Sequence, residues 1–109
     1  MKKPLIAALL CGVNWLAQAA FPDKTITLIV PYPPGGATDI LARKLAVPLG
    51  QRLGQTVVVE NKAGAGTAIG ATLLAKSAPD GYTLLLSSNT TFTVNAALKK
   101  NLPYDPQKD

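Results

Sequence analysis

The sequence has no histidine, and its single cysteine, Cys11, lies among the first twenty of 109 residues. Histidine is the commonest general base, and histidine and cysteine are the commonest zinc ligands. A serine such as Ser87 would have no histidine to activate it as a nucleophile. The acidic residues are widely spaced along the chain. We therefore expect no enzyme activity, no catalytic residues, no metal and no cofactor.

Acidic side chains are few, six against eleven basic ones. The first nineteen residues hold two of the basic side chains, Lys2 and Lys3, and no acid, so the rest of the chain carries a net charge of +3. Its basic residues are scattered and are not interleaved with aromatic residues. This pattern predicts no nucleic-acid partner.

The chain also has no apolar run long enough to span a bilayer. Residues 5–13 are apolar, Met1-Lys2-Lys3 precedes them, and Ala17-Gln18-Ala19 follows with the small-x-small form of a cleavage site. This order predicts a signal peptide at residues 1–19, a mature chain that starts at Ala20, and a periplasmic location. An N-terminal membrane-surface helix on a cytosolic protein is the alternative.

Cys11 raises the possibility of a lipoprotein. However, the bulky Leu10 precedes it where lipidation requires a small residue, and Cys11 lies inside the apolar run. We therefore expect no covalent membrane anchor. The mature chain has no cysteine, so disulfides cannot stabilise it.

What the chain does have is a strand, a tight loop and a helix in succession. Residues 26–30 are apolar, Pro31-Tyr32-Pro33-Pro34-Gly35-Gly36 follows them, and residues 38–53 have a helical pattern. The prolines restrict the loop, and the glycines let its backbone turn and approach a ligand. The N–H groups and dipole of the helix would favour a carboxylate or phosphate there. The alternative is a connection whose Gly and Pro serve only the turn.

The first helix has a leucine at every fourth position, which predicts its buried face. We expect Thr38 or Ala37 as its N-cap, Asp39 in its first turn, a kink at Pro48, and Gly54 as a left-handed C-cap. The residues expected on the buried face are Ile40, Leu41, Leu45, Leu49 and Leu53.

The rest of the chain repeats this alternation. We expect strands at 57–60 and 82–87, a helix at 67–77 that buries Ile69, Leu73 and Leu74, a short helix at 93–99, and an irregular segment at 102–106. The order predicts an α/β fold, a parallel sheet with helices on both faces. Ligands of such sheets bind beyond the carboxyl ends of the strands, where residues 31–37, 61–66 and 87–91 would lie.

The loop at 61–66 also allows a Rossmann-like dinucleotide site. Gly64, Gly66 and Gly70 follow a strand and open a helix, but their spacing is one residue longer than the usual fingerprint. The next strand ends at Leu86-Ser87-Ser88, without the acid that would bind the ribose. A dinucleotide-binding fragment of an exported enzyme remains the alternative function, and a small interaction module is a third class.

Four blocks together resemble a known family. They are P-Y-P-P-G-G-A-T-D-I-L-A-R, L-G-Q-T-V-V-V-E-N-K-A-G-A-G-T-A-I-G-A, A-P-D-G-Y-T-L-L-L and L-P-Y-D-P-Q-K-D. In this order they are similar to the receptors of tripartite tricarboxylate transporters, also called Bug-type extracytoplasmic solute receptors.

The resemblance implies a periplasmic binding protein of two α/β lobes, which binds a small carboxylate in the cleft between them and delivers it to a two-subunit membrane permease. It implies a structural role for Asp39 at the helix start. The implied ligand-binding residues of the first lobe are Tyr32, Pro34, Gly35, Gly36, Thr38, Ser87, Ser88, Asn89 and Thr90.

Members of the family are roughly three times as long as this chain. We therefore expect residues 20–109 to be the N-terminal part of the first lobe, with the second lobe absent, from a truncated gene or an incomplete sequence. The identity of the carboxylate is left open.

Overall fold

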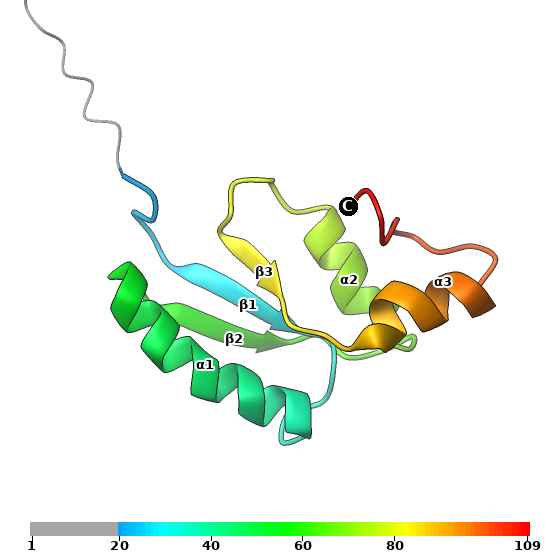
Figure 1. Ribbon diagram of the computed structural model, residues 1–109, viewed down its shortest axis with the longest axis horizontal. Coiled ribbons are helices and arrows are strands. Elements are labelled where there is room, and N and C mark those ends of the chain that lie inside the picture. The colour runs from blue at the N-terminus through cyan, green and yellow to red at the C-terminus, as the bar shows by residue number, and fades with distance from the viewer. Residues whose placement is uncertain (1–19) are drawn as a thin grey trace, which may run out of the picture.

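A three-stranded parallel sheet forms the centre of the computed structural model, which describes residues 20–109 (Figure 1). The strands are β1 (Ile26–Val30), β2 (Val57–Asn61) and β3 (Thr83–Leu85), and their order in the sheet is β2-β1-β3. The predicted parallel α/β fold is confirmed. The predicted signal peptide and the environment of Cys11 lie outside the described residues.

The first strand lies between the other two. Ile26 pairs with Val57, and Thr27 pairs with Val58 on one side and with Thr83 on the other. Ile26, Ile29 and Val30 are at most 1% exposed. A central strand covered on both faces has no solvent-facing side, which explains the continuous apolar run.

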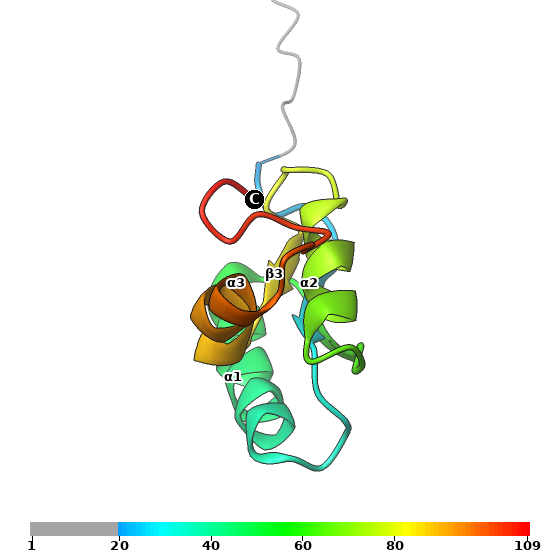
Figure 2. The ribbon, with the colours of Figure 1, turned by 90° about the vertical axis from the view of Figure 1, so that its right-hand side faces the viewer.

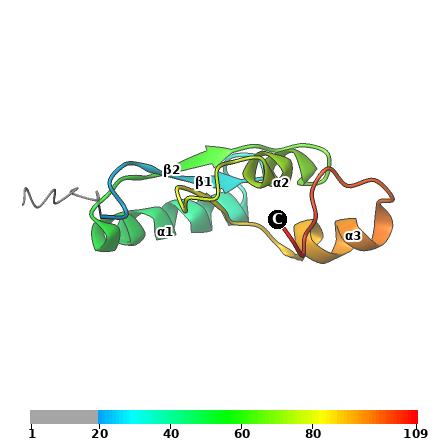
Figure 3. The same ribbon diagram turned by 90° about the horizontal axis from the view of Figure 1, so that it is seen from above.

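The two longer helices cover opposite faces of the sheet. Figures 2 and 3 show α1 (Ala37–Leu53) on one face and α2 (Ala68–Ala75) on the other. On the first face Leu28 and Val30 pack with Ala42 and Ala46 of α1. On the second face a smaller cluster joins Ala68, Ala71, Leu85, Leu102 and Tyr104.

The predicted buried face of α1 is wrong at its N-terminal half. The buried residues of α1 are Asp39, Ala42 and Ala46, whereas Ile40, Leu41 and Leu45 are 45–50% exposed. Leu49 and Leu53 do pack against the core, partly buried. The helix lies close to the sheet through small alanine side chains, and this turns the larger residues to its flanks.

Of the two predicted caps of α1, only the C-cap is confirmed. The N-cap is Gly36, not Thr38 or Ala37. Because glycine has no side chain, there is no side-chain capping hydrogen bond. Gly54 closes the other end in the left-handed conformation, as predicted, with φ of 69°. The helix continues through Pro48, which lies inside it.

The second helix is shorter than predicted, and its buried face is also different. Ala68, Gly70 and Ala71 are buried, Leu74 is partly buried, and Ile69 and Leu73 are exposed. A Cβ atom on Gly70 would lie 2.7 Å from the Cβ of Pro31. The glycine therefore lets α2 contact the start of the loop after β1, and the bulky residues lie away from that contact.

After β3 the chain forms a π-helical turn, η1 (Thr90–Val94), and one turn of helix, α3 (Asn95–Leu98). The predicted helix at 93–99 is thus partly right, although it starts earlier and with a different hydrogen-bond pattern. The segment that follows is irregular, as predicted, and returns Tyr104 to the second cluster, where it is 8% exposed. Between residues 20 and 109, the structure contains no helix that combines the length and the apolar character needed to cross a membrane.

Candidate functional site

The carboxyl ends of the three strands meet at one edge of the sheet, where the loops after β1, β2 and β3 leave it (Figure 1). Two backbone hydrogen bonds extend the ladder into these loops, from the N–H of Lys62 to the carbonyl of Val30 and from the N–H of Leu86 to that of Ile29. The three loops predicted to share this edge therefore begin side by side.

Tyr32 joins the first loop to the third. Its hydroxyl lies 2.5 Å from Oγ of Ser88. Burial raises the pKa of Tyr32, but hydrogen bonds from Ser88, Ser87 and Thr90 outweigh it and hold this pKa below the ordinary value of 10.0. The phenol oxygen therefore lies among several donors, an environment that stabilises negative charge.

Asp39 and Asn61 join the first loop to the second. The buried Asp39 carboxylate accepts hydrogen bonds from Gly35 N–H at 2.9 Å, Asn61 Nδ2 at 2.9 Å and Arg43 Nε at 3.1 Å. These bonds, Gly35 first, lower its pKa from 3.8 to about 2. Because its oxygens are occupied by the protein, Asp39 has the structural role expected of it.

Asn61 was not among the predicted site residues, although it ends a strand at this edge. Its amide also donates to the carbonyl of Tyr32 at 3.1 Å and accepts from Arg43 at 3.0 Å. Its position in the E-N-K-A-G run after an apolar strand is the only signal of this role in the sequence.

The loop before α2 has an unusual backbone. Ala65 and Thr67, neither of them glycine, have positive φ of 50° and 76°, and Gly64 and Gly66 on either side of Ala65 are also positive. Such conformations are unfavourable for residues with a Cβ and are concentrated at functional sites. The glycines were visible in the sequence, but the strained residues between them were not.

A buried polar network holds this second loop to the third. Thr91 Oγ1 lies 2.5 Å from Ser87 Oγ and donates to Thr67 Oγ1 at 2.6 Å. Asn95 donates to the carbonyl of Gly66 at 2.7 Å, and Tyr104 donates to the carbonyl of Thr91 at 2.6 Å. The network therefore fixes the second loop, the third loop and the C-terminal segment against one another.

The structure brings some of the predicted binding residues together. The Tyr32 hydroxyl contacts Ser88 directly, and Ser87 and Thr90 are near enough to lower the pKa of the same hydroxyl. The others lie at the same edge without a direct contact to that group: Pro34, Gly35, Gly36 and Asn89 are exposed, and Thr38 is half-buried in the first turn of α1. Most of these residues are therefore exposed to solvent at the carboxyl edge of the sheet.

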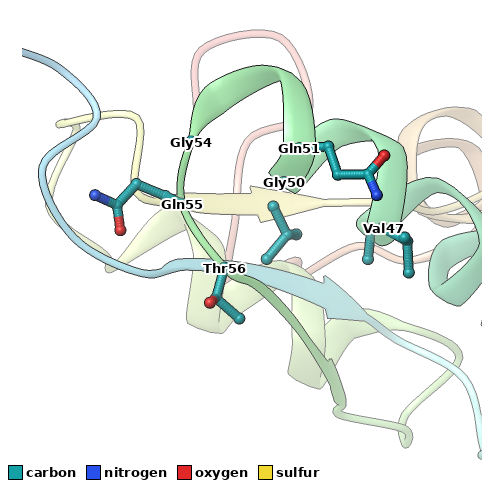
Figure 4. Close-up of a pocket in the computed structure, with 8 residues that line it drawn as sticks. Val47, Gly50, Gln51, Gly54, Gln55 and Thr56 are labelled. Carbon is teal, nitrogen blue, oxygen red and sulfur yellow. The ribbon is translucent and has the colours of Figure 1, made fainter.

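A hollow of about 460 Å³ lies at the opposite edge of the sheet (Figure 4). It is a shallow, open hollow between the end of α1 and the start of β2, and none of the predicted binding residues lines it. Its lining residues are Ala46, Val47, Gly50, Gln51, Gly54, Gln55, Thr56 and Val57. It lies beyond the amino ends of the strands, where open α/β sheets do not usually bind ligands.

The glycines of the possible dinucleotide fingerprint have other roles here. Gly70 permits the contact of α2 with Pro31, and a Cβ on Gly64 would lie 2.6 Å from Cδ1 of Ile69. The strand that follows leads into Ser87 and Ser88 rather than an acid. Within residues 20–109 no group of three potential metal-ligating side chains occurs.

Comparison with known proteins gives consistent matches. Residues 41–109 match the family described as the tripartite tricarboxylate transporter family receptor. The chain is 52% identical to protein BugT of Bordetella pertussis over 90 residues, which cover 82% of this chain and 28% of BugT.

Solved structures share the fold. A periplasmic transporter structure is 55% identical with a TM-score of 0.80, over 83% of this chain and 30% of that one. MatC from Rhodopseudomonas palustris with bound malate is 41% identical with a TM-score of 0.77, over 81% and 30% of the two chains. An R. palustris protein with adipate is 36% identical, also with a TM-score of 0.77, over 82% and 30%.

The chain is much shorter than these proteins. It spans between 26% and 32% of the length of the curated relatives that it matches.

Proposed function

The chain belongs to the tripartite tricarboxylate transporter receptor family, and from this membership we propose that it forms one wall of a periplasmic site for a small carboxylate. The wall consists of the loops after β1 and β3, with Tyr32, Pro34, Gly35, Gly36, Thr38, Ser87, Ser88, Asn89 and Thr90 as the contact residues. The complete receptor delivers the carboxylate to a membrane transporter with a two-subunit permease, and it is a binding protein, not an enzyme.

One observation carries the proposal: the three loops at the carboxyl edge of the sheet are joined to one another around Tyr32. Its hydroxyl bonds Ser88, and its carbonyl accepts from Asn61, which also bonds Asp39. Similar proteins have been solved with malate and with adipate, both of which carry two carboxylates. Hydroxyl and backbone N–H donors suit such ligands.

The charge at this edge supports recognition by neutral donors. Arg43 of α1 is bonded to Asp39 and Asn61. Its charge is therefore compensated by the protein, and a ligand carboxylate would depend on N–H and O–H groups. Such groups accept many carboxylates, so the identity of the ligand would depend on the complete cleft.

Titration with malate, adipate and NAD tests the proposal. We expect either dicarboxylate to shift the backbone N–H resonances of residues 32, 35–38 and 87–90 in nuclear magnetic resonance spectra, and NAD to shift none. For the full-length protein, ligand at a hundredfold excess over Kd would add about 2.7 kcal/mol of stability, visible as a higher Tm. A response to NAD with none to any carboxylate would favour the dinucleotide alternative. No response to either would favour an interaction module.

A further inference from the structure

The first loop of the candidate site has more hydrogen-bond acceptors than donors. Residues 31–36 contain three prolines, which keep their carbonyl groups but have no N–H. The N–H of Gly35 is already donated to Asp39, at 2.9 Å. A carboxylate ligand can only accept hydrogen bonds, so it requires that the acceptors around this loop be turned away from it.

Asn61, at the end of β2, binds an acceptor of the loop and the carboxylate that follows it. Its Nδ2 donates to the carbonyl of Tyr32 at 3.1 Å and to Oδ1 of Asp39 at 2.9 Å. The Asp39 carboxylate is buried, and it is ionised at neutral pH because its pKa is about 2. Both acceptors are therefore directed at the end of β2.

The neighbours of Asn61 fix the orientation of its amide. The Tyr32 carbonyl and the ionised Asp39 can only accept, so both protons of Nδ2 point to them. Arg43 can only donate, and its Nη2 lies 3.0 Å from Oδ1 of Asn61. This position thus uses two donors on one side of the group and an acceptor on the other. A carboxylate of the same shape would have no donor for either Tyr32 or Asp39.

We propose that Asn61 is a positioning residue for the carboxylate site. It keeps the Tyr32 carbonyl and the Asp39 carboxylate turned toward β2, so that neither repels a bound carboxylate and the Tyr32 hydroxyl stays beside Ser88. This inference rests on the proposed carboxylate site. Asn61 does not contact the ligand and acts through Tyr32 and Asp39.

Asn61→Asp in the full 109-residue chain tests the role, with malate binding followed by nuclear magnetic resonance. The variant keeps the shape of the side chain, removes both donors and adds a negative charge behind the first loop. We expect Kd for malate to rise at least about tenfold. Val57→Ala is the matched control, because Val57 is buried at the opposite end of the same strand. It should lower Tm and change Kd by no more than about twofold.

The double variant Asp39→Asn/Asn61→Asp separates positioning from stability. It exchanges the donor and the acceptor of one hydrogen bond and keeps the net charge, but it leaves the Tyr32 carbonyl without a donor. We expect it to recover most of the Tm that Asn61→Asp loses, while Kd stays at least about fivefold above that of the unmodified chain. Recovery of Kd together with Tm would overturn the proposal, because the site would then depend only on the bond between positions 39 and 61.

The outcomes separate this inference from the function on which it rests. If the unmodified chain does not respond to malate, the carboxylate site is refuted and the role of Asn61 with it. If the unmodified chain responds and Asn61→Asp binds malate equally well, only the role of Asn61 is refuted. Equal losses of affinity in Asn61→Asp and Val57→Ala would also refute it, because they indicate a general effect of stability.

If Asn61→Asp prevents folding because it places two carboxylates side by side, the unmodified chain provides the test through the NH₂ protons of Asn61. Both protons are held in hydrogen bonds. They should exchange with water at least about tenfold more slowly than those of the exposed Asn101, with and without malate. Exchange as fast as that of Asn101 in either state would overturn the proposal, because the Tyr32 carbonyl would not be held.

Discussion

Asp39 stabilises this protein by joining parts of the chain that are distant in sequence. Its carboxylate accepts a hydrogen bond from the N–H of Gly35, in the loop before α1, and another from Asn61 at the end of β2. The buried carboxylate therefore fixes the first loop against the second. A charge so placed is favourable only while it is ionised and fully bonded.

The stability of the fold should consequently depend on Asp39 in acid. Its pKa is about 2 in the folded chain and near 3.8 otherwise, so its contribution is complete above pH 3.8 and is lost as the pH falls through 2. Asp39→Asn should remove this part of the pH dependence and lower Tm at pH 7 by roughly 5 °C or more. Calorimetry from pH 2 to pH 7 measures both effects.

Glu60→Gln is a suitable control for Asp39, because Glu60 is exposed on β2. It should leave Tm at pH 7 nearly unchanged. A Glu60 variant that loses as much stability as Asp39→Asn would contradict the role given to Asp39.

Tyr32 and Tyr82 should ionise in a defined order. The pKa of Tyr32 is lowered by the donors around it, whereas that of Tyr82 is raised, first by its hydrogen bond to Asp23. Ultraviolet difference spectra should show that Tyr32→Phe removes the earlier of these two transitions and Tyr82→Phe the later one. If malate binds beside Tyr32, its charge should move the Tyr32 transition to higher pH. The reverse order would show that Ser88 does not bond Tyr32 in solution.

At the scale of the elements, the positions of the strands and turns were predictable because their signals are local, although β3 is shorter than the strand predicted at 82–87. β1 has the predicted bounds, and Gly54 ends α1 because glycine adopts positive φ without strain. The buried faces of the helices could not be predicted from local signals. The leucine repeat of α1 has the spacing of a buried face. However, the helix lies so close to the sheet that only the small side chains of Ala42 and Ala46 fit between them. This close distance depends on packing with β1 and β2, which the helix sequence alone does not show.

Two neighbouring positions of α1 test this correction. Leu45 is 45% exposed and Ala46 is 7% exposed. Leu45→Gln should change the free energy of unfolding by less than about 1 kcal/mol. Ala46→Gln places a larger polar group against the sheet and should cost at least about 2 kcal/mol. Urea unfolding of both variants gives the comparison, and equal losses would restore the leucine stripe as the core face.

At the scale of the whole molecule, the sequence located the edge where the loops meet but not the bonds that join them. Tyr32 and Ser88 were predicted as contact residues from the family resemblance, and they lie together. The links through Asn61, Thr67, Thr91 and Tyr104 were not predicted. Apart from the bond between Ser87 and Thr91, these links pair polar groups at least nine positions apart, and no local pattern marks such pairs.

Residues 20–109 by themselves should bind carboxylates weakly and self-associate. Both β2 and β3 are edge strands, and Val58 and Leu84 on them are 41% and 37% exposed. A ligand held by one wall keeps a solvated face, where each polar contact contributes little. We expect Kd for malate no tighter than about 1 mM, near −4 kcal/mol, and dimers that form as the concentration rises. Sedimentation together with calorimetry measures both, and a monomer with micromolar affinity would contradict this expectation.

The strand order β2-β1-β3 has a consequence for how such receptors diversify. Since β1 is central, the chain leaves it toward α1 on one face and leaves β2 toward α2 on the other. The loops after β1 and β3 therefore begin on neighbouring strands and lead to different elements, at a topological switch point. The apolar residues that hold the sheet lie behind this point, and the polar residues that would contact a ligand lie in front of it. Selection could thus alter ligand preference by exchanging loop residues, and the scaffold would pass unchanged from one receptor to the next.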